Sequence, residues 1–554
     1  MSSQSFASSS TRNPTEVFAV HGADPEILAF AMAKYSRSSL SMRESLREIS
    51  SQRAEQFLNT FYFQYGHRSI ADLAHIAFAV ERLSLLAAIV LADEQRWDGQ
   101  ERSTRYQNFS KSGCFFPDFG EDAGSAKLYS DTIESLYATY HRTGDAVLEV
   151  LRRHVERPDA MKPESYERTL RARAFDCARY LLPLATNTSL GQIVSARTLE
   201  TQVSRLLSHP AAEVRDLGAR LRDAATGPAW NSNAAVAQAF VDRLAAYEEQ
   251  TGKLLSLDEA AASGPAGASA AGESLAEEAA RLFTREVRTA PTLVKYAQPN
   301  PYEMETRREL ARAAAEILAH LPAERPANPV DLVERTEPLE VELAATLLYS
   351  ASHRSYRQIR DFVADLSAPR IEEIIDLGLR QRGSHDEALR AFHAGAALRF
   401  DLLMDIGAFR DLHRHRRCTQ IIQEFTTTHG YATPGAGDLP AGINILGEAG
   451  ILDDYRAAIE GAHRASERIA AGPAPEAAQS ALYLLPLATC ARSLFKMDFA
   501  EAQYISELRS APAGHFSYRR IAWEMYMAIE RQHPSLAKYI RVTDFSRPID
   551  ILQR

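Results

Sequence analysis

The stretch RDLHRHRRCTQIIQEF, Arg410 to Phe425, concentrates positive charge in a chain that is acidic overall. Its HRHRR core lies in a 554-residue chain with a formal net charge of −9 at pH 7. Guanidinium groups are always charged and bind phosphate in a bidentate manner, so Arg414, His415 and Arg416 suit the binding of a pyrophosphate. The alternative is a solvated helix end, because cations are favoured near helix C-termini.

A second polar stretch, QERSTRY, lies in the first half of the chain at residues 100–106. Glu101, Ser103 and Arg105 alternate there, so in an extended segment their side chains point the same way. A carboxylate, a hydroxyl and a guanidinium, with the phenol of Tyr106 beside them, suit a phosphorylated and hydroxylated ligand. The alternative is a surface loop with a local Glu–Arg pair.

Two further segments, YGHRS at 65–69 and ASHRS at 351–355, each place a His and a Ser before an expected helix. Ser69 and Ser355 are therefore also candidates for helix N-caps. No His/Asp partner at an interpretable spacing supports a serine-hydrolase triad. The sequence contains no GxGxxG and no GxxxxGK[ST], so it predicts neither a Rossmann dinucleotide site nor a P-loop.

Mostly helical elements are expected to position these residues. Apolar residues recur at spacings of three and four in two places, which predicts two helices that each lead into a polar loop; they are Ile76, Val80, Leu83, Ala87 and Val90, and Leu398, Leu402, Ile406 and Phe409. The run LSLLAAIVLA, Leu83 to Ala92, is about half the length of a membrane span and is predicted to be a buried helix.

The chain contains an internal duplication. YLLPLAT occurs at 180–186 and again at 483–489, and each half ends in an Arg-containing helix, within HPAAEVRDLG or ELRSAPAGHFSYRRIA. The Ala/Gly/Ser-rich segment Leu257 to Ser274 cannot build a core and predicts a flexible linker. We therefore expect an N-terminal domain at 1–255, a linker at 256–280 and a C-terminal domain at 281–554.

Bulk composition is that of a globular protein, and the length predicts two to four domains. The Ser-rich start lacks an apolar segment, so we expect a disordered tail rather than a signal peptide. Four cysteines lie far apart without a CxxC pair, which argues against a zinc site or a disulfide framework and favours a reducing cytoplasm. The negative charge disfavours nucleic acid as a partner, and no membrane partner is expected.

Taken together, these motifs resemble the flavin-dependent thymidylate synthases (ThyX). The signature of that family is RHRxxSxNExSxRY, with GHxSxxE upstream and LPxxxxT and EIR downstream. The resemblance covers most of the chain outside the tail, the linker and an insertion in the second half. It implies an α+β fold of two tandem, mostly helical domains, each with a small β-sheet, which form a pseudo-dimer.

The signature is divided between the halves. The first half keeps Glu101, Ser103 and Arg105-Tyr106, but where RHR is expected it has Asp93-Glu94-Gln95 or, in an alternative register, the three residues that begin one position earlier. The second half keeps RHR at 414–416 and lacks ExSxRY. Active sites of the family lie at subunit interfaces of a homotetramer. The resemblance therefore implies one composite site from both halves, degenerate partner sites, and a homodimer of fused chains.

Residue roles follow from the resemblance alone. It implies FAD held by Arg414, His415, Arg416, Ser36, His67, Ser69 and Asp72, with His353 and Ser355 repeating part of that set. It implies a pyrimidine nucleotide bound by Glu101, Ser103, Arg105, Arg215, Arg492 and Arg519, of which the first three are the catalytic candidates. The implied reaction is reductive C5 methylation of dUMP to dTMP with methylenetetrahydrofolate and NADPH as co-substrates, and it requires no cysteine nucleophile.

Two substitutions leave alternatives open. Asp411 stands three residues before RHR, where the family usually has a Gln near the nucleotide, and Gln100-Glu101 replaces the Asn-Glu pair. An unpaired buried carboxylate is costly and changes which ligand a site tolerates. The alternatives are a flavoenzyme of the same fold that modifies another pyrimidine nucleotide or carries out a different one-carbon transfer, and a non-catalytic flavin- or nucleotide-binding paralogue.

Overall fold

The computed structural model describes most of the chain; the described ranges are 22–34, 42–48, 68–109, 113–251, 275–284, 286–295, 297–322, 328–333, 339–381, 389–392, 398–435, 444–537, 540–547 and 550–553. The Ser-rich start, Ser36, His67 and the segment Leu257 to Ser274 lie outside these ranges. The chain divides into two compact units, of which one comprises Met1–Ile76, Ser195–Arg197 and Asp223–Lys295, and the other Ala77–Val194, Thr198–Arg222 and Tyr296–Arg554.

The described part of the first unit is helical. Its helices are α1 (Pro25–Lys34), α2 (Met42–Glu48), η2 (Arg68–Leu73), α9 (Ala234–Thr251) and α11 (Leu275–Phe283). Helices α9 and α11 pack against each other, and the rings of Phe240 and Phe283 meet edge to face with centroids 6.2 Å apart. Helix α11 begins at Leu275, inside the range 256–280 that was predicted to be a linker.

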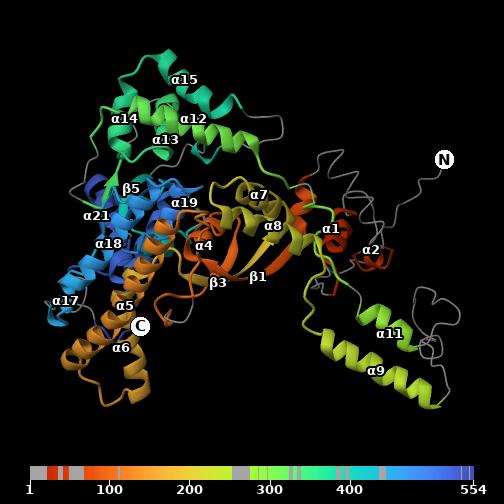
Figure 1. Ribbon diagram of the computed structural model, residues 1–554. Coiled ribbons are helices and arrows are strands. Elements are labelled where there is room, and N and C mark those ends of the chain that lie inside the picture. The colour runs from red at the N-terminus through yellow and green to blue at the C-terminus, as the bar shows by residue number, and fades with distance from the viewer. Residues whose placement is uncertain are drawn as a thin grey trace, which may run out of the picture. The chain divides into compact units, whose positions relative to one another are not determined.

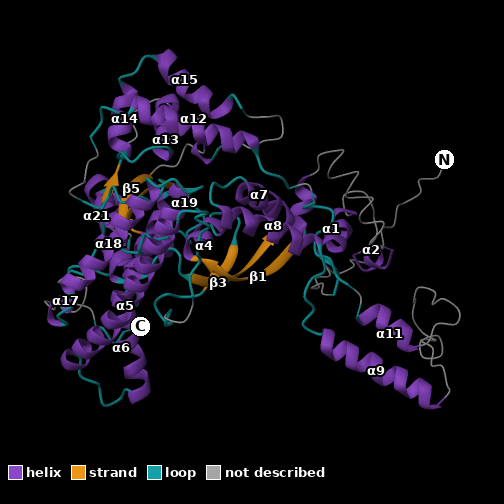
Figure 2. Cartoon of the chain, viewed as in Figure 1, coloured by secondary structure: helices purple, strands orange, loops and turns teal. Residues whose placement is uncertain are grey.

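The second unit contains most of the remaining first half of the chain, and β1, β3, α7 and α8 below each have a few end residues in the first unit. Its elements are β1 (His75–Ser84), α4 (Leu85–Leu91), β2 (Asp98–Glu101), α5 (Ala123–His154), α6 (Pro163–Ala178), η3 (Arg179–Leu181), β3 (Asn187–Ser195), α7 (Ala196–Leu207) and α8 (Ala212–Thr226). The strands form a sheet in the order β1-β3-β2, with β2 antiparallel to β3 and Glu101 opposite Leu190 (Figure 2). Helices α5 and α6 lie side by side (Figure 1).

The second half of the chain completes this unit. Its helices are α12 (Pro301–Ile317), α13 (Leu339–Ser350), α14 (Tyr356–Ala364), α15 (Ala368–Leu379), η4 (Arg390–Phe392), α16 (Ile406–Leu412), α17 (Ile445–Glu448), α18 (Leu452–Ala470), α19 (Ala477–Leu482), α20 (Phe499–Ser510), α21 (Phe516–Gln532) and α22 (Pro534–Ala537). Its strands are β4 (Val330–Leu332), β5 (Leu398–Asp405), β6 (Thr419–Ile422) and β7 (Cys490–Met497).

These four strands form an antiparallel sheet in the order β4-β5-β7-β6. Helices α12 to α15 gather in one layer, which packs on the sheet through Ile421 and Leu494 (Figure 1). The predicted α+β class, mostly helical with a small sheet in each half, is confirmed. No helix in the described ranges is both long enough and apolar enough to cross a membrane.

The two predicted amphipathic helices are wrong in their first parts. Ile76, Val80 and Leu83 lie in strand β1, and Leu398 and Leu402 lie in strand β5. A spacing of four residues returns to the same face in a strand as well as in a helix, so such pairs do not distinguish the two. Only the later stripe positions are helical, in α4 and α16. The predicted buried helix within Leu83 to Ala92 is confirmed as α4.

A local two-fold relation links the repeated YLLPLAT segments, whose prolines Pro183 and Pro486 form an antiparallel bridge. Leu184 N donates to Leu485 O at 2.9 Å, and the equivalent Leu487 N donates to Leu182 O at 3.0 Å. The same exchange joins Ala185 N to Tyr483 O and Ala488 N to Tyr180 O, at 2.8 and 3.0 Å. The duplicated halves therefore pair with each other as two subunits of a dimer would.

Ser355 is the N-cap of α14, as the sequence allowed. Its side chain accepts from Gln358 N, and the Gln358 side chain reaches back to Ser355 N, which completes a capping box. We expect Ser355→Ala to lower the free energy of unfolding by about 1 kcal/mol, because an unsatisfied backbone N–H is left behind. Urea unfolding would measure this loss. Ser355→Thr keeps the hydroxyl and should lose less, and an alanine variant as stable as the native chain would contradict the cap.

Candidate active site

The basic cluster follows α16 directly. Helix α16 begins at the N-cap Asp405, whose carboxylate accepts from Ala408 N at 2.8 Å, and ends at Leu412. Arg414 and Arg417 are exposed, His415 is buried, and Arg416 is half-buried. The cluster is therefore neither a fully solvated helix end nor a closed core, because two of its arginines are exposed and its histidine is buried.

His415 is held as a neutral hydrogen-bond acceptor. Arg509 Nε, from α20, donates to His415 Nε2 at 2.8 Å, so the ring proton is assigned to Nδ1, which lies 3.5 Å from Glu501 Oε1. Burial lowers the pKa of His415, and the charge of Arg509 lowers it further against the opposing effect of Glu501. The positive charge at this position consequently belongs to the guanidinium groups and not to the imidazole.

Arg416 reaches across to the first half of the chain. Its guanidinium carbon lies 4.9 Å from the ring centroid of Trp97, whose Nε1 donates to Gln192 Oε1 at 2.7 Å and so fixes the ring. Burial lowers the pKa of Arg416 to about 10, although the carboxylates of Asp93 and Glu101 oppose the shift. Arg416 Nε is buried and has no hydrogen-bond partner among the described residues. Such a donor is a candidate for a ligand contact.

Glu101 and Arg410 join the two parts of the divided signature. Arg410 Nη2 donates to Glu101 Oε2 at 2.7 Å, and both side chains are at least nine-tenths buried. Ser103 follows two residues later, and its hydroxyl accepts from Arg105 N at 3.3 Å. The structure thus brings the 101–105 segment beside the 410–416 segment, more than three hundred residues away in the chain.

Arg105 is fully engaged within the protein. Its guanidinium forms a two-point ion pair with Asp176, with contacts of 2.7 and 3.2 Å, and donates to Tyr518 Oη at 3.0 Å and to Ala513 O at 3.1 Å. Burial opposes its charge, but Asp176 outweighs this and raises the pKa of Arg105. The predicted role of Arg105 in binding a nucleotide stays a prediction; the contact that the structure gives is one that links the two halves.

Asp411 is paired and not an isolated charge. Its carboxylate accepts from Arg179 Nη1 at 3.1 Å. Burial raises the pKa of Asp411, but the charges of Arg179, Arg414 and Arg105 outweigh it and hold the pKa at about 2. Gly407 makes room for this pair, because a Cβ there would lie 3.2 Å from Arg179 Nη2.

Acid should remove the stability that Asp411 provides. Its folded pKa of about 2 lies below the ordinary value of 3.8, so the contribution is present above pH 4 and is lost as pH falls toward 2. We expect Asp411→Asn to lower the free energy of unfolding by roughly 2 kcal/mol at pH 7, and by less as the pH falls below 4. Urea unfolding across this range would test it, with the exposed Asp216→Asn as control. A loss independent of pH would contradict the ion pair.

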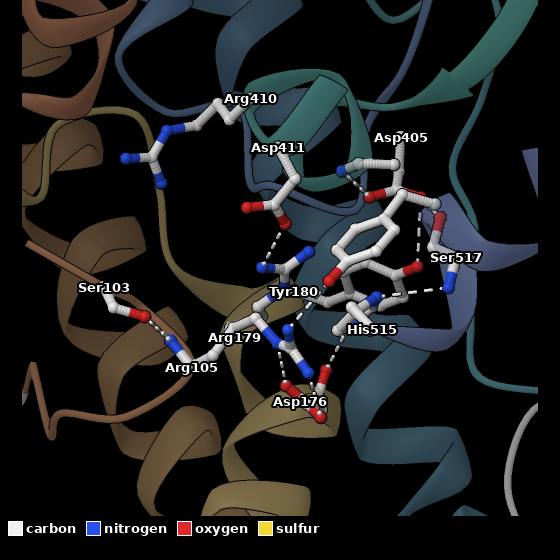
Figure 3. Close-up of polar contacts among 12 residues, drawn as sticks. Ser103, Arg105, Asp176, Arg179, Tyr180, Asp405, Arg410, Asp411, His515 and Ser517 are labelled. Atoms are coloured by element: carbon white, nitrogen blue, oxygen red, sulfur yellow. Dashed lines mark hydrogen bonds and ion pairs between the residues drawn. The ribbon is translucent and has the colours of Figure 1, made fainter. Parts of the chain in front are cut away.

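A buried polar network lies behind these residues (Figure 3). Tyr180 Oη donates to Asp405 Oδ2 at 3.1 Å, Ser517 Oγ donates to the same oxygen, and His515 Nε2 lies 2.9 Å from Asp176 O. Burial raises the pKa of Asp405 and lowers that of His515. The network joins residues of both halves and lies beside the candidate site.

The remaining arginine candidates lie elsewhere. Arg492, in β7, pairs with Asp401 at 2.8 Å and lines a cavity of about 330 Å³ that neither the 101–105 nor the 414–416 segment borders. Arg519 is buried and donates to Ser510 O at 2.9 Å. Arg215 donates to His209 O at 3.0 Å and contacts Glu476. None of the hydrogen bonds and ion pairs named in this paragraph joins two of these three arginines.

The upstream candidates belong partly to the first unit. Asp72 pairs with Arg197 at 3.0 Å, and Ser69 lies in η2. His353 and Ser355 lie at the start of α14, where Ser355 also borders the cavity beside Arg492. The flavin contacts that the resemblance implied for these residues stay predictions.

Sequence reasoning missed the partners that organise the site, which are Trp97, Asp176, Arg179, Asp405, Arg509 and His515. Arg509 and His515 had a detectable signal, because both lie in ELRSAPAGHFSYRRIA, the Arg-containing segment that ends the second half. Asp176 and Arg179 lie just before the repeated YLLPLAT, but nothing in their spacing indicates which charge each one meets.

Comparison with known proteins shows which family the chain is similar to. The family model described as thymidylate synthase complementing protein matches residues 18–226 and again residues 331–535. A UPF0159 protein of Chlamydia pneumoniae is 26% identical over 97% of this chain and 93% of its own length. A UPF0159 protein of Thermoplasma acidophilum is 24% identical over 93% of this chain and 94% of its own length.

A flavin-dependent thymidylate synthase of Clostridium tetani is 23% identical over 32% of this chain and 67% of its own length. The family model matches twice, once in each half, and the two matches cover well over half of the residues. The chain therefore belongs to the thymidylate synthase complementing protein family, as a tandem duplication of the family's unit.

Proposed function

We propose that the chain is an FAD-dependent enzyme that methylates C5 of dUMP to give dTMP, with methylenetetrahydrofolate and NADPH as co-substrates. Its active site is a composite, in which the first half supplies Glu101 and Ser103 and the second half supplies Arg414 and Arg416. The working form is a homodimer of fused chains. The predicted domain boundaries, at 255 and 281, are part of this proposal.

One observation carries the proposal: the segments that hold the two remnants of the signature lie against each other. Arg410, four residues before RHR, bonds Glu101 at 2.7 Å, and Arg416 lies over Trp97, four residues before Glu101. If two independent sites had decayed at random, there would be no reason for the segments that remain to be complementary and to lie in contact. Their meeting supports a single site maintained across both halves.

The donor set suits the pyrophosphate of FAD. Arg414 is exposed, Arg416 carries a buried Nε without a partner among the described residues, and Arg509 donates to His415, the residue between them in the sequence. Guanidinium forks match phosphate oxygens, and a water-poor surrounding strengthens that attraction. FAD, when bound, supplies the hydride-transfer chemistry. The protein binds and orients the reactants, with Ser103 and Glu101 offering a hydroxyl and a carboxylate to the nucleotide.

The pairing of Asp411 supports the ordinary nucleotide over the alternatives. An isolated carboxylate at this position would repel a phosphate, whereas Asp411 is neutralised by Arg179 at 3.1 Å. The charge that suggested a different pyrimidine ligand is thus balanced inside the protein.

The proposal is tested first by colour and then by complementation. Purified protein should be yellow or become yellow with added FAD. A colourless protein that takes up no FAD would contradict the proposed function. A strain that requires thymidine should grow with the native gene and should fail with Ser103→Ala or with Arg416→Gln. Flavin uptake without rescue would point instead to another pyrimidine nucleotide. The exposed Arg220→Gln serves as a control that should still rescue growth.

A further inference from the structure

The duplication places an acidic segment where the other half has its basic cluster. Helices α4 and α16 begin in the same way: Leu85 N donates to Thr186 O and Ile406 N donates to Thr489 O, both at 2.9 Å. Eight residues after these starts stand Asp93 and Arg414, so Asp93-Glu94-Gln95 is the structural equivalent of Arg414-His415-Arg416.

The arginine that faces each segment comes from the corresponding helix, α7 or α20. Arg205 and Arg509 each stand ten residues before the matched arginines Arg215 and Arg519, and counted from the helix starts they differ by one position. Arg509 donates to His415, while Arg205 donates to Glu94, with contacts of 2.9 and 2.7 Å to Oε1. The corresponding helix therefore brings an arginine to a neutral imidazole in one half and to a carboxylate in the other.

These partners leave opposite charges at the two positions. Around His415 stand Arg414, Arg416 and Arg509, and Glu501 is the acid that faces the imidazole. Asp411, Glu101 and Asp93 also act on these arginines, but each of them is paired with another arginine, namely Arg179, Arg410 and Arg390. Such a position has positive charge left over for an anionic ligand, because its histidine contributes none.

The first-half position is neutralised from within the chain. Glu94 pairs with Arg205 at 2.7 Å, and Asp93 pairs with Arg390 at 2.6 Å. Asp93 Oδ1 also lies 3.7 Å from His413 Nε2. Burial raises the pKa of Glu94, and the charge of Arg205 opposes this shift. A phosphate approaching here would meet two carboxylates and would have to separate two ion pairs.

We infer that Asp93 and Glu94 act as internal anions that close the first-half position, so that each chain binds one anionic cofactor, at the Arg414–Arg416 position. The carboxylates take the place that a ligand phosphate would take beside Arg205 and Arg390. The inference rests on the proposed function in that it uses the cofactor proposed there.

Binding stoichiometry tests the inference. Titration of the full native chain with FAD, and separately with inorganic pyrophosphate, should give one equivalent of either ligand per chain. Two equivalents would overturn the inference. No uptake of FAD with one equivalent of pyrophosphate would defeat the proposed function and leave the inference standing, and no uptake of either would defeat both.

A charge-removing variant tests the mechanism. Asp93→Asn combined with Glu94→Gln keeps the size of both side chains, and it should raise pyrophosphate uptake from one to two equivalents per chain. The matched control, Asp216→Asn with Glu149→Gln, removes two exposed carboxylates and should still bind one. A folded double variant, by circular dichroism, that binds only one equivalent would overturn the role of the two carboxylates. If the variant does not fold, the native stoichiometry decides the matter.

Discussion

Replacing Arg416 by glutamine is expected to lower the affinity for FAD by about ten- to a hundredfold, with little change in stability. A hydrogen bond between charged groups contributes roughly 1.5–3 kcal/mol, and the loss of one corresponds to that factor. The native guanidinium lies over Trp97 and keeps a buried Nε without a partner among the described residues, so its removal breaks no ion pair of the core. Quenching of flavin fluorescence would measure the affinity.

The neighbouring Arg417 provides the matched control. It is exposed and its nearest carboxylate, on Asp498 at 3.0 Å, is exposed as well, so that pair contributes little. Arg417→Gln should change the affinity less than about threefold, within the range of exposed ion pairs. Equal losses from both variants would indicate a diffuse electrostatic attraction and would contradict a specific contact by Arg416. A salt titration of both variants separates the two cases, because exposed charges are screened more strongly.

Replacing Arg105 by methionine is expected to lower the free energy of unfolding by about 3–5 kcal/mol, because it removes the two-point partner of the buried Asp176, whose other ion pair, with Arg173, is longer at 3.7 Å. The side chains of this pair are 8% and 1% exposed, and Arg105 also donates to Tyr518 and Ala513 of the second half. Breaking these contacts therefore weakens the junction of the halves as well as the local loop. Guanidinium or thermal unfolding would measure the loss.

A surface arginine supplies the comparison. Arg220 pairs with Asp216 one helical turn away, and both side chains are mostly exposed. Arg220→Met should cost less than about 0.5 kcal/mol. If Arg105→Met proved equally mild while dTMP formation was lost, Arg105 would be a ligand-binding residue and the ion pair with Asp176 would be secondary. If stability and activity fell together, its role would be to hold the two halves in register.

Part of the fold was predictable because it depends on short motifs in the sequence. The duplication, the α+β class and the buried helix α4 all follow from short motifs and apolar runs, and each agrees with the structure or the family match. The division of the signature into a composite site stays a prediction. The segments before α4 and α16 are strands, although their apolar spacing predicts helices. Leu398 and Leu402 share a face in either element, so the spacing does not distinguish the two. Strand β5 buries its Arg399 and Asp401 as well, so its polarity pattern misleads.

The charge pairing was not predictable, because it depends on contacts between distant residues. Nothing near Arg105 in the sequence points to Asp176, and nothing near Asp411 points to Arg179. The Arg179–Asp411 pair joins the two halves, and the Arg105–Asp176 pair lies within the first half and is completed by Tyr518 of the second. Burial then fixes the result, since a charge that leaves water must have a partner.

By itself, the sequence determined that this protein carries one family signature divided between two copies of a domain. Short motifs survive in order, and such order is visible without any coordinates. Only the tertiary structure decided which cations remain available to a ligand. It joins Glu101 to Arg410, matches Glu94 with Arg205 and leaves His415 uncharged beside Arg509. The physical reason is that the number of charges is a property of the sequence, whereas their neutralisation depends on which carboxylate the fold brings within bonding distance of each guanidinium.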